Sequence, residues 1–199
     1  MRVTSGTIDY ICRDMLHLGL WRPDMGDCRE DTDVLSACDS LLEVMYVIGA
    51  YHYLERVAAR VFGAALPPAF GLHIGIGTDE AQYPAIWFME PWFGFGAGGG
   101  PSALALIPQY PIGTLHADFA VAYGDDNGSP QWTIGAIIEI DGYGVHRTQR
   151  ERDAHRAAYI EGVCKVPVLR FFEESHDPLT WFQYVVEHFH DRPSVQEVG

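Results

Sequence analysis

The chain is poor in lysine and lacks any long apolar run. Only Lys165 among its 13 basic residues is a lysine, and no stretch approaches the roughly 18 consecutive apolar residues that indicate a transmembrane helix. The first residues contain no long apolar segment of the kind found in a signal peptide. We therefore expect a cytoplasmic protein with no membrane partner.

Cysteine is also scarce, and its spacing argues against a zinc site. Cys12, Cys28, Cys38 and Cys164 are far apart and form no Cys-x-x-Cys pair. We expect them to be free thiols in a reducing compartment. The glycine-rich segment 94–100 is not followed by the Lys-Ser/Thr of a phosphate-binding loop, so it is interpreted as a mobile loop.

Acidic residues outnumber basic ones strongly, but not evenly along the chain. The net charge of −14 excludes a protein that simply coats nucleic acid, because that mode of binding depends on neutralising phosphates. Nevertheless, six of the 13 basic residues lie within residues 147–170, whereas acidic residues crowd residues 24–43. The net charge thus conceals a local basic segment.

The apolar pattern predicts one mixed α/β domain spanning residues 1–199. Hydrophobic residues at helical spacing predict a helix from Ser40 to about residue 62. Within the domain we distinguish an acidic N-terminal extension, about residues 1–38. We also distinguish an insertion, about residues 64–105, that has no assigned role.

The second half of the chain predicts a hairpin followed by helix, strand and helix. Alternating residues in 115–123 and 131–141 flank an Asp-Asn-Gly turn, which predicts two paired strands. A helix is expected over 146–162 and a strand over 165–172. Asp177-Pro178 is typical of the start of a closing helix.

Carboxylates gather at the end of the predicted hairpin. Side chains alternate along a strand, so Glu139 and Asp141 share one face, and pairing of the strands would bring Asp118 beside one of them. Neighbouring carboxylates raise each other's pKa unless a cation holds them. Oxygen ligands without cysteine favour Mg²⁺ or Mn²⁺, either of which could activate water and neutralise charge on a phosphoryl group.

Each of these residues also has a purely structural interpretation. Glu139 and Asp141 could be solvated strand-end residues or could pair with arginines of the following helix. Glu43 follows Ser40 with the Ser-x-x-Glu spacing of a capping box. His146 could serve as a structural hydrogen-bonding group.

Several short motifs together resemble the PD-(D/E)XK nuclease superfamily, in particular its very-short-patch-repair-like endonuclease branch. In chain order they are DSLLE, IPQYPIGTLHADF, IIEIDGYGVH, RDAHRAAYI and VPVLRFF. The resemblance covers about residues 39–175, interrupted by residues 64–105. It implies a restriction-endonuclease-like core, with a mixed central β-sheet flanked by helices, and a Mg²⁺- or Mn²⁺-dependent endonuclease that hydrolyses DNA.

The resemblance also implies roles for individual residues. Asp118 and Glu139 would be metal ligands at the chemical centre, and Asp141 would add a ligand where many members of the superfamily carry lysine. Glu43 would act as an outer ligand or position water, and Gln109 would support the site from close by. His146 would transfer a proton, since imidazole titrates near neutral pH.

Arginines of the basic segment would contact nucleic acid. These are Arg147, Arg150, Arg156 and Arg170. For Arg156, an ion pair with Asp153 three residues earlier is an equally good interpretation.

Two other functions are compatible with the sequence. The net charge of −14 and the missing motif lysine favour a catalytically degenerate nuclease fold that acts as a binding or regulatory partner. A different metal hydrolase, or a glycosidase with two carboxylates and no metal, is a weaker alternative. The pattern leaves undecided whether the partner is DNA or RNA and whether the protein forms a homodimer or binds another protein.

Overall fold

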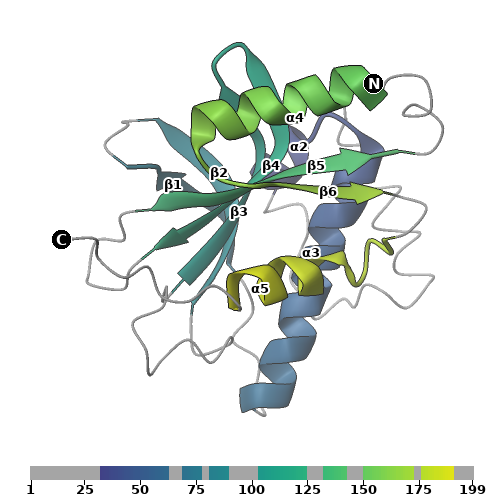
Figure 1. Cartoon of the computed structure of the whole chain (residues 1–199). Helices are drawn as coiled ribbons and strands as arrows, with labels where there is room; N and C mark the ends of the chain where they lie inside the picture. Colours follow the sequence, from purple (N-terminus) through teal and green to yellow (C-terminus); the bar gives the residue numbers. More distant parts are fainter. Residues whose placement is uncertain are drawn as a thin grey trace.

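A computed structural model gives the fold, a mixed α/β arrangement around a six-stranded sheet, as expected (Figure 1). The residues it describes are 32–62, 69–77, 81–89, 103–124, 132–142, 150–172 and 176–190. The helices are α2 (Thr32–Ala37), α3 (Leu41–Phe62), α4 (Arg150–Cys164) and α5 (Trp181–His190). The strands are β1 (Ala69–Gly75), β2 (Gln82–Met89), β3 (Ala103–Ile112), β4 (Leu115–Gly124), β5 (Thr133–Asp141) and β6 (Val168–Phe172). Within these residues no helix combines the length and the apolar character needed to cross a bilayer.

The strands follow one another across the sheet in chain order, from β1 to β6. Neighbours are antiparallel up to β5, and the predicted pairing of the two strands around the Asp-Asn-Gly turn is confirmed, with Phe119 opposite Ile138. β6 instead runs parallel to β5, and α4 provides the crossover that a parallel pair requires. This parallel pair places the carboxyl ends of β5 and β6 side by side.

The segment 64–105 contributes directly to the sheet. Its described part forms β1, β2 and the first residues of β3, which extend the sheet away from β4. The end of the acidic N-terminal segment is likewise packed, since Val34 and Leu35 of α2 are buried in the core. The described parts of both segments therefore belong to the same hydrophobic framework as the rest of the fold.

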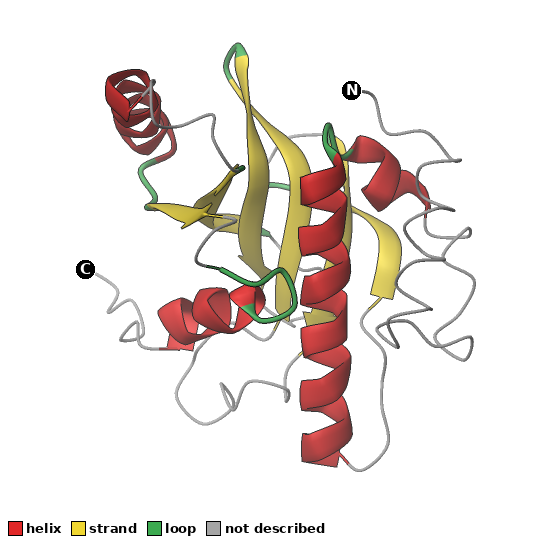
Figure 2. Cartoon of the chain, turned by 90° about the vertical axis from the view of Figure 1, so that its right-hand side faces the viewer, coloured by secondary structure: helices red, strands yellow, loops and turns green. Residues whose placement is uncertain are grey.

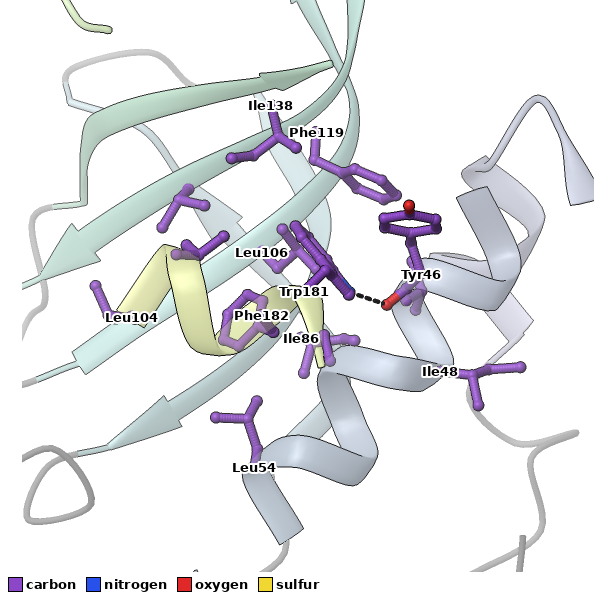
Figure 3. Close-up of a cluster of buried hydrophobic side chains, with 14 of the residues drawn as sticks. Tyr46, Ile48, Leu54, Ile86, Leu104, Leu106, Phe119, Ile138, Trp181 and Phe182 are labelled. Carbon is purple, nitrogen blue, oxygen red and sulfur yellow. Dashed lines mark hydrogen bonds between the residues drawn. The ribbon is translucent and has the colours of Figure 1, made fainter. Parts of the chain in front are cut away.

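Helices cover both faces of the sheet, and α3 and α4 lie on opposite sides of the strands in Figure 2. On the face of α2, α3 and α5, the fully buried Trp181 packs against Tyr46 and Phe119, with ring centroids 5.2 and 6.0 Å away. The indole Nε1 of Trp181 donates a hydrogen bond to the carbonyl oxygen of Tyr46 at 2.8 Å (Figure 3). On the opposite face, Ile160 of α4 packs with Ile137 of β5.

Two helix starts use the side chains that the sequence indicates. Ser40 Oγ accepts a hydrogen bond from the backbone N–H of Glu43 at 3.1 Å, as expected of an N-cap. Asp177 Oδ1 accepts one from the N–H of Leu179 at 2.9 Å, and Pro178 follows it before α5 begins at Trp181. The capping of α3 fixes the position of Glu43, which is also part of the candidate site.

Candidate functional site

The predicted acidic residues meet where β5 ends. In Figure 1 the ends of β5 and β6 lie near the beginning of α3. Glu43 comes from the first turn of α3, whereas Asp118 lies near the start of β4 and Glu139 near the end of β5. Backbone pairing in the sheet and capping of the helix thus bring together residues about 100 positions apart in the chain.

Asp118 faces Glu139 across the two central strands. The β4–β5 register pairs Phe119 with Ile138, and one further step places Asp118 opposite Glu139. Asp118 Oδ2 accepts a hydrogen bond from the backbone N–H of Ile140 at 2.6 Å. The carboxylate therefore takes the place of a backbone acceptor at the end of the ladder, which fixes its orientation.

The surroundings of this pair raise the pKa of both acids. Burial raises the pKa of Asp118 from 3.8 to about 7, opposed by the Ile140 N–H and reinforced by the charges of Glu139 and Glu43. Burial also raises the pKa of Glu139, although its hydrogen bond with Arg156 acts in the opposite direction. A cation at this position would favour the ionised forms.

Glu43 caps the start of α3 and also contacts β3. Its side chain is only 6% exposed. Its carboxylate accepts hydrogen bonds from the Ser40 hydroxyl at 2.8 Å and from the Asp39 backbone N–H at 2.9 Å, so the capping interpretation is confirmed. Glu43 Oε2 also accepts a hydrogen bond from Nε2 of Gln109 at 2.8 Å, which connects the helix start to β3.

Gln109 adopts an unusual backbone conformation to make this contact. Its φ of 49° lies in the left-handed region, which non-glycine residues rarely occupy. In the β3–β4 register, Gln109 stands between the pairs Pro108–Phe119 and Tyr110–Ala117, opposite Asp118. Strained backbone of this kind is concentrated at functional sites, so Gln109 belongs with the acidic residues in the candidate site.

Arg156 of α4 holds Glu139 through both carboxylate oxygens. Its Nε lies 3.1 Å from Oε2 and its Nη2 lies 3.2 Å from Oε1, while Nη2 also donates to the carbonyl oxygen of His116. The interpretation that a strand acid pairs with an arginine of the following helix is confirmed for Glu139. The side chain of Asp153, the other partner considered for Arg156, lies outside the described residues.

Asp141 forms an ion pair with an arginine of β6. Its side chain is 5% exposed, and its Oδ2 lies 2.5 Å from Nη2 of Arg170 on β6. Arg170 in turn lies over the ring of Phe172, 5.8 Å from the ring centroid. Two guanidinium groups, those of Arg156 and Arg170, therefore stand beside the acids at the end of β5.

Three other predicted residues are not placed at the site by the structure. His146 and Arg147 lie outside the described residues, and so does the side chain of Arg150, whose backbone begins α4.

One nearby group was not predicted from the sequence. The buried thiol of Cys38 has a pKa well above its usual value because of burial and the charges of Glu43, Asp39 and Asp118. Nothing in the sequence near residue 38 indicates that Asp118 lies close to it.

The acidic pair fits a divalent metal ion only in part. Among the described residues, no group of three or more His, Cys, Asp and Glu side chains is arranged to hold a metal ion. Asp118 and Glu139 nonetheless supply hard oxygen donors, and Mg²⁺ is commonly bound through one or two carboxylates, waters and substrate phosphates. In the described arrangement the guanidinium of Arg156 supplies the positive charge at Glu139.

The site therefore consists of two facing carboxylates, Asp118 and Glu139, with Glu43 and Gln109 on one side and two arginines on the other. Such an arrangement can bind a cation through its carboxylates and an anion through its guanidinium groups.

Comparisons of the chain with models of protein families, with curated proteins and with solved structures found no match.

Proposed function

We propose that the protein is a Mg²⁺- or Mn²⁺-dependent endonuclease that hydrolyses DNA phosphodiester bonds on a restriction-endonuclease-like core. The observation that carries the proposal is the facing pair Asp118 and Glu139 on adjacent strands, both with a raised pKa. Two desolvated acids at one position are a costly arrangement for a purely structural role. Perturbed acids of this kind are characteristic of functional sites.

The order of elements also supports this function. After α3 and the strands β1 and β2, the chain runs β3, β4, β5, α4, β6. With β1 and β2 set aside, this is the order of the motifs in the superfamily that the sequence resembles. Glu43 lies on the helix, Gln109 and Asp118 on successive strands, and Glu139 on the next strand. Each motif therefore falls on an element of the type that the resemblance implies.

The residues suit hydrolysis of a phosphodiester. A divalent metal held by Asp118 and Glu139, with Asp141 as a third proposed ligand, would activate the attacking water and offset charge on the phosphoryl group. The Ile140 N–H holds the Asp118 carboxylate in place, and Gln109 holds Glu43 beside it. Arg156 and Arg170 would contact phosphate oxygens, to which guanidinium groups bind well. His146 remains the proposed proton-transfer group.

A second function is supported by the same ion pairs. Arg156 and Arg170 neutralise Glu139 and Asp141 without a metal, and the chain carries a net charge of −14. These features suit a nuclease-like protein that has lost catalysis and binds or regulates a partner. Metal binding distinguishes the two functions.

The test is calorimetric titration of the purified protein with Mn²⁺ at pH 8, alongside Asp118→Asn and Glu139→Gln. We expect one Mn²⁺ site in the wild type and at least a roughly hundredfold loss of affinity in both variants, because even outer partners of metal ligands contribute about 10–100-fold. Glu187→Gln, which removes an exposed carboxylate on α5, is the matched control and should bind as the wild type does. Absence of Mn²⁺ binding by the wild type would favour the regulatory function.

A further inference from the structure

Arg156 occupies both oxygens of the carboxylate that the proposed function assigns to the metal. The Glu139 side chain is only 12% exposed, and the two contacts at 3.1 and 3.2 Å form a fork on its carboxylate. Paired in this way, Glu139 has its charge balanced inside the protein. A second cation on the same carboxylate would meet the repulsion of the guanidinium at short range.

We propose that Arg156 is an internal counter-cation that competes with the divalent metal for Glu139, and that its release creates a binding site for a nucleic-acid phosphate. This inference rests on the proposed function, because it assigns the metal to Glu139. It adds that metal and phosphate bind cooperatively. The metal takes over the charge of Glu139, and the guanidinium becomes available to an anion.

The surroundings of Arg156 suit such an exchange. Its side chain is 34% exposed, so the guanidinium reaches solvent while its target, Glu139, is largely covered. Its Nη2 also donates to the carbonyl oxygen of His116 on β4, a contact that does not involve Glu139. That second contact can keep the guanidinium at the site when the carboxylate changes partner, so that the N–H groups released by Glu139 can donate to phosphate oxygens.

The charge of the chain explains why an exchange of this kind would be useful. A protein with a net charge of −14 repels a polyanion, and the guanidinium groups of Arg156 and Arg170 are both paired with acids. Phosphate binding would then be weak until a divalent cation occupies the acidic pair. Linkage requires the converse as well: a bound phosphate must tighten metal binding by the same factor.

The test compares Mn²⁺ dissociation constants of the wild type and Arg156→Gln, measured by calorimetry with and without thymidine monophosphate as the phosphate probe. Without the probe, we expect Arg156→Gln to bind Mn²⁺ roughly tenfold more tightly, within the range of about 5–150-fold typical of coupled sites. The probe should tighten Mn²⁺ binding by the wild type but not by the variant.

Two further variants separate competition from general effects. Lys165→Gln removes one positive charge just past the end of α4, which extends about 12 Å beyond Arg156 at a rise of about 1.5 Å per residue. This change should leave Mn²⁺ affinity unchanged. Arg156→Lys keeps the positive charge but loses the bidentate contact with the Glu139 carboxylate, so this variant should bind Mn²⁺ with intermediate affinity. It also provides a second measurement if Arg156→Gln fails to fold in a melting experiment.

The results also distinguish this inference from the proposed function. Equal or weaker Mn²⁺ binding by Arg156→Gln, next to a wild type that binds Mn²⁺, would overturn the competition and leave the metal site standing. In that case Arg156 would serve to orient Glu139. No Mn²⁺ binding by the wild type or by either Arg156 variant would overturn both the competition and the metal-dependent function.

Discussion

Asp118→Asn is expected to make the metal-free protein more stable than the wild type at pH 8. The pKa of Asp118 is raised from 3.8 to about 7 in the folded protein, chiefly by burial. At pH 8 the wild type therefore holds a carboxylate ionised in surroundings that oppose its charge. Asparagine has a similar shape and an oxygen that can still accept the hydrogen bond from the Ile140 N–H, without the charge.

The sign of the pH dependence follows from proton binding. Between about pH 4 and pH 7 the folded protein retains a proton that the unfolded chain has released, so the stability that Asp118 contributes falls as pH rises. Over the whole window the change approaches about 4 kcal/mol, at about 1.4 kcal/mol per pKa unit. Between pH 5 and pH 8, the advantage of Asp118→Asn over the wild type should grow by roughly 2–3 kcal/mol.

Urea unfolding of both proteins with EDTA, at intervals from pH 5 to pH 8, measures this difference. Glu187→Gln serves as the control, because it removes a carboxylate of the same charge from an exposed position on α5. A stability difference between wild type and Asp118→Asn that does not change with pH would mean that Asp118 is not held in an unfavourable environment. The main electrostatic support for the candidate site would then be lost.

Gly49→Ala is expected to destabilise the fold severely, against the usual preference of helices for alanine. A Cβ at position 49 of α3 would lie 1.6 Å from the carbonyl oxygen and 2.6 Å from the carbonyl carbon of Pro178. Both atoms belong to backbone, so α3 and the turn before α5 would have to separate. This separation would also displace the indole of Trp181, which is hydrogen-bonded to the Tyr46 carbonyl oxygen.

The expected loss is about 3 kcal/mol or more, at or above the upper end of overpacking effects. Gly162→Ala in α4 is the matched control, since a Cβ there meets nothing within 4 Å. That change should stabilise the protein by up to about 1 kcal/mol, the ordinary advantage of alanine over glycine in a helix. Thermal melts of the three proteins check both results, and a mild effect of Gly49→Ala would contradict the close packing of α3 against the turn.

Local chemistry predicted the central elements well. The Asp-Asn-Gly turn and the alternation on either side of it predicted the β4–β5 hairpin, and Ser40 and Asp177 marked two helix starts. In each case the residues that indicate the element lie within a few positions of the turn or helix start that they specify. The facing of Asp118 and Glu139 then followed from the pairing of a predicted hairpin.

The strand β3 was harder to predict because prolines interrupt it. Pro108 and Pro111 lack the N–H that a central strand must donate, so the sequence around them does not indicate a strand. β3 in fact pairs with β2 only through residues 103–106 and with β4 along most of its length. The prolines lie beyond the part paired with β2, where a missing donor costs little.

The ion-pair partners of Arg156 and Arg170 depend on how helix and strands pack in the folded protein. Spacing along α4 suggested Asp153 for Arg156, and the side chain of Asp153 lies outside the described residues. The packing of α4 on the sheet brings Arg156 to Glu139 on β5, which the spacing does not indicate. Arg170 reaches Asp141 because β6 runs parallel beside β5, which no local signal near either residue specifies. The acids were predictable from sequence, and so was an arginine of the following helix beside Glu139. The pairing of Asp141 with Arg170 required the arrangement of the sheet.

The most direct measurement is cleavage of single- and double-stranded DNA by the purified protein with Mg²⁺, Mn²⁺ or EDTA. We expect cleavage that requires the metal and falls by about a thousandfold in Asp118→Asn and Glu139→Gln, a loss comparable to removing a principal source of transition-state charge stabilisation. Glu187→Gln should cleave as the wild type does. Cleavage that persists in EDTA or in both site variants would contradict the assignment of the chemistry to these acids, and so would no cleavage of either substrate with either metal.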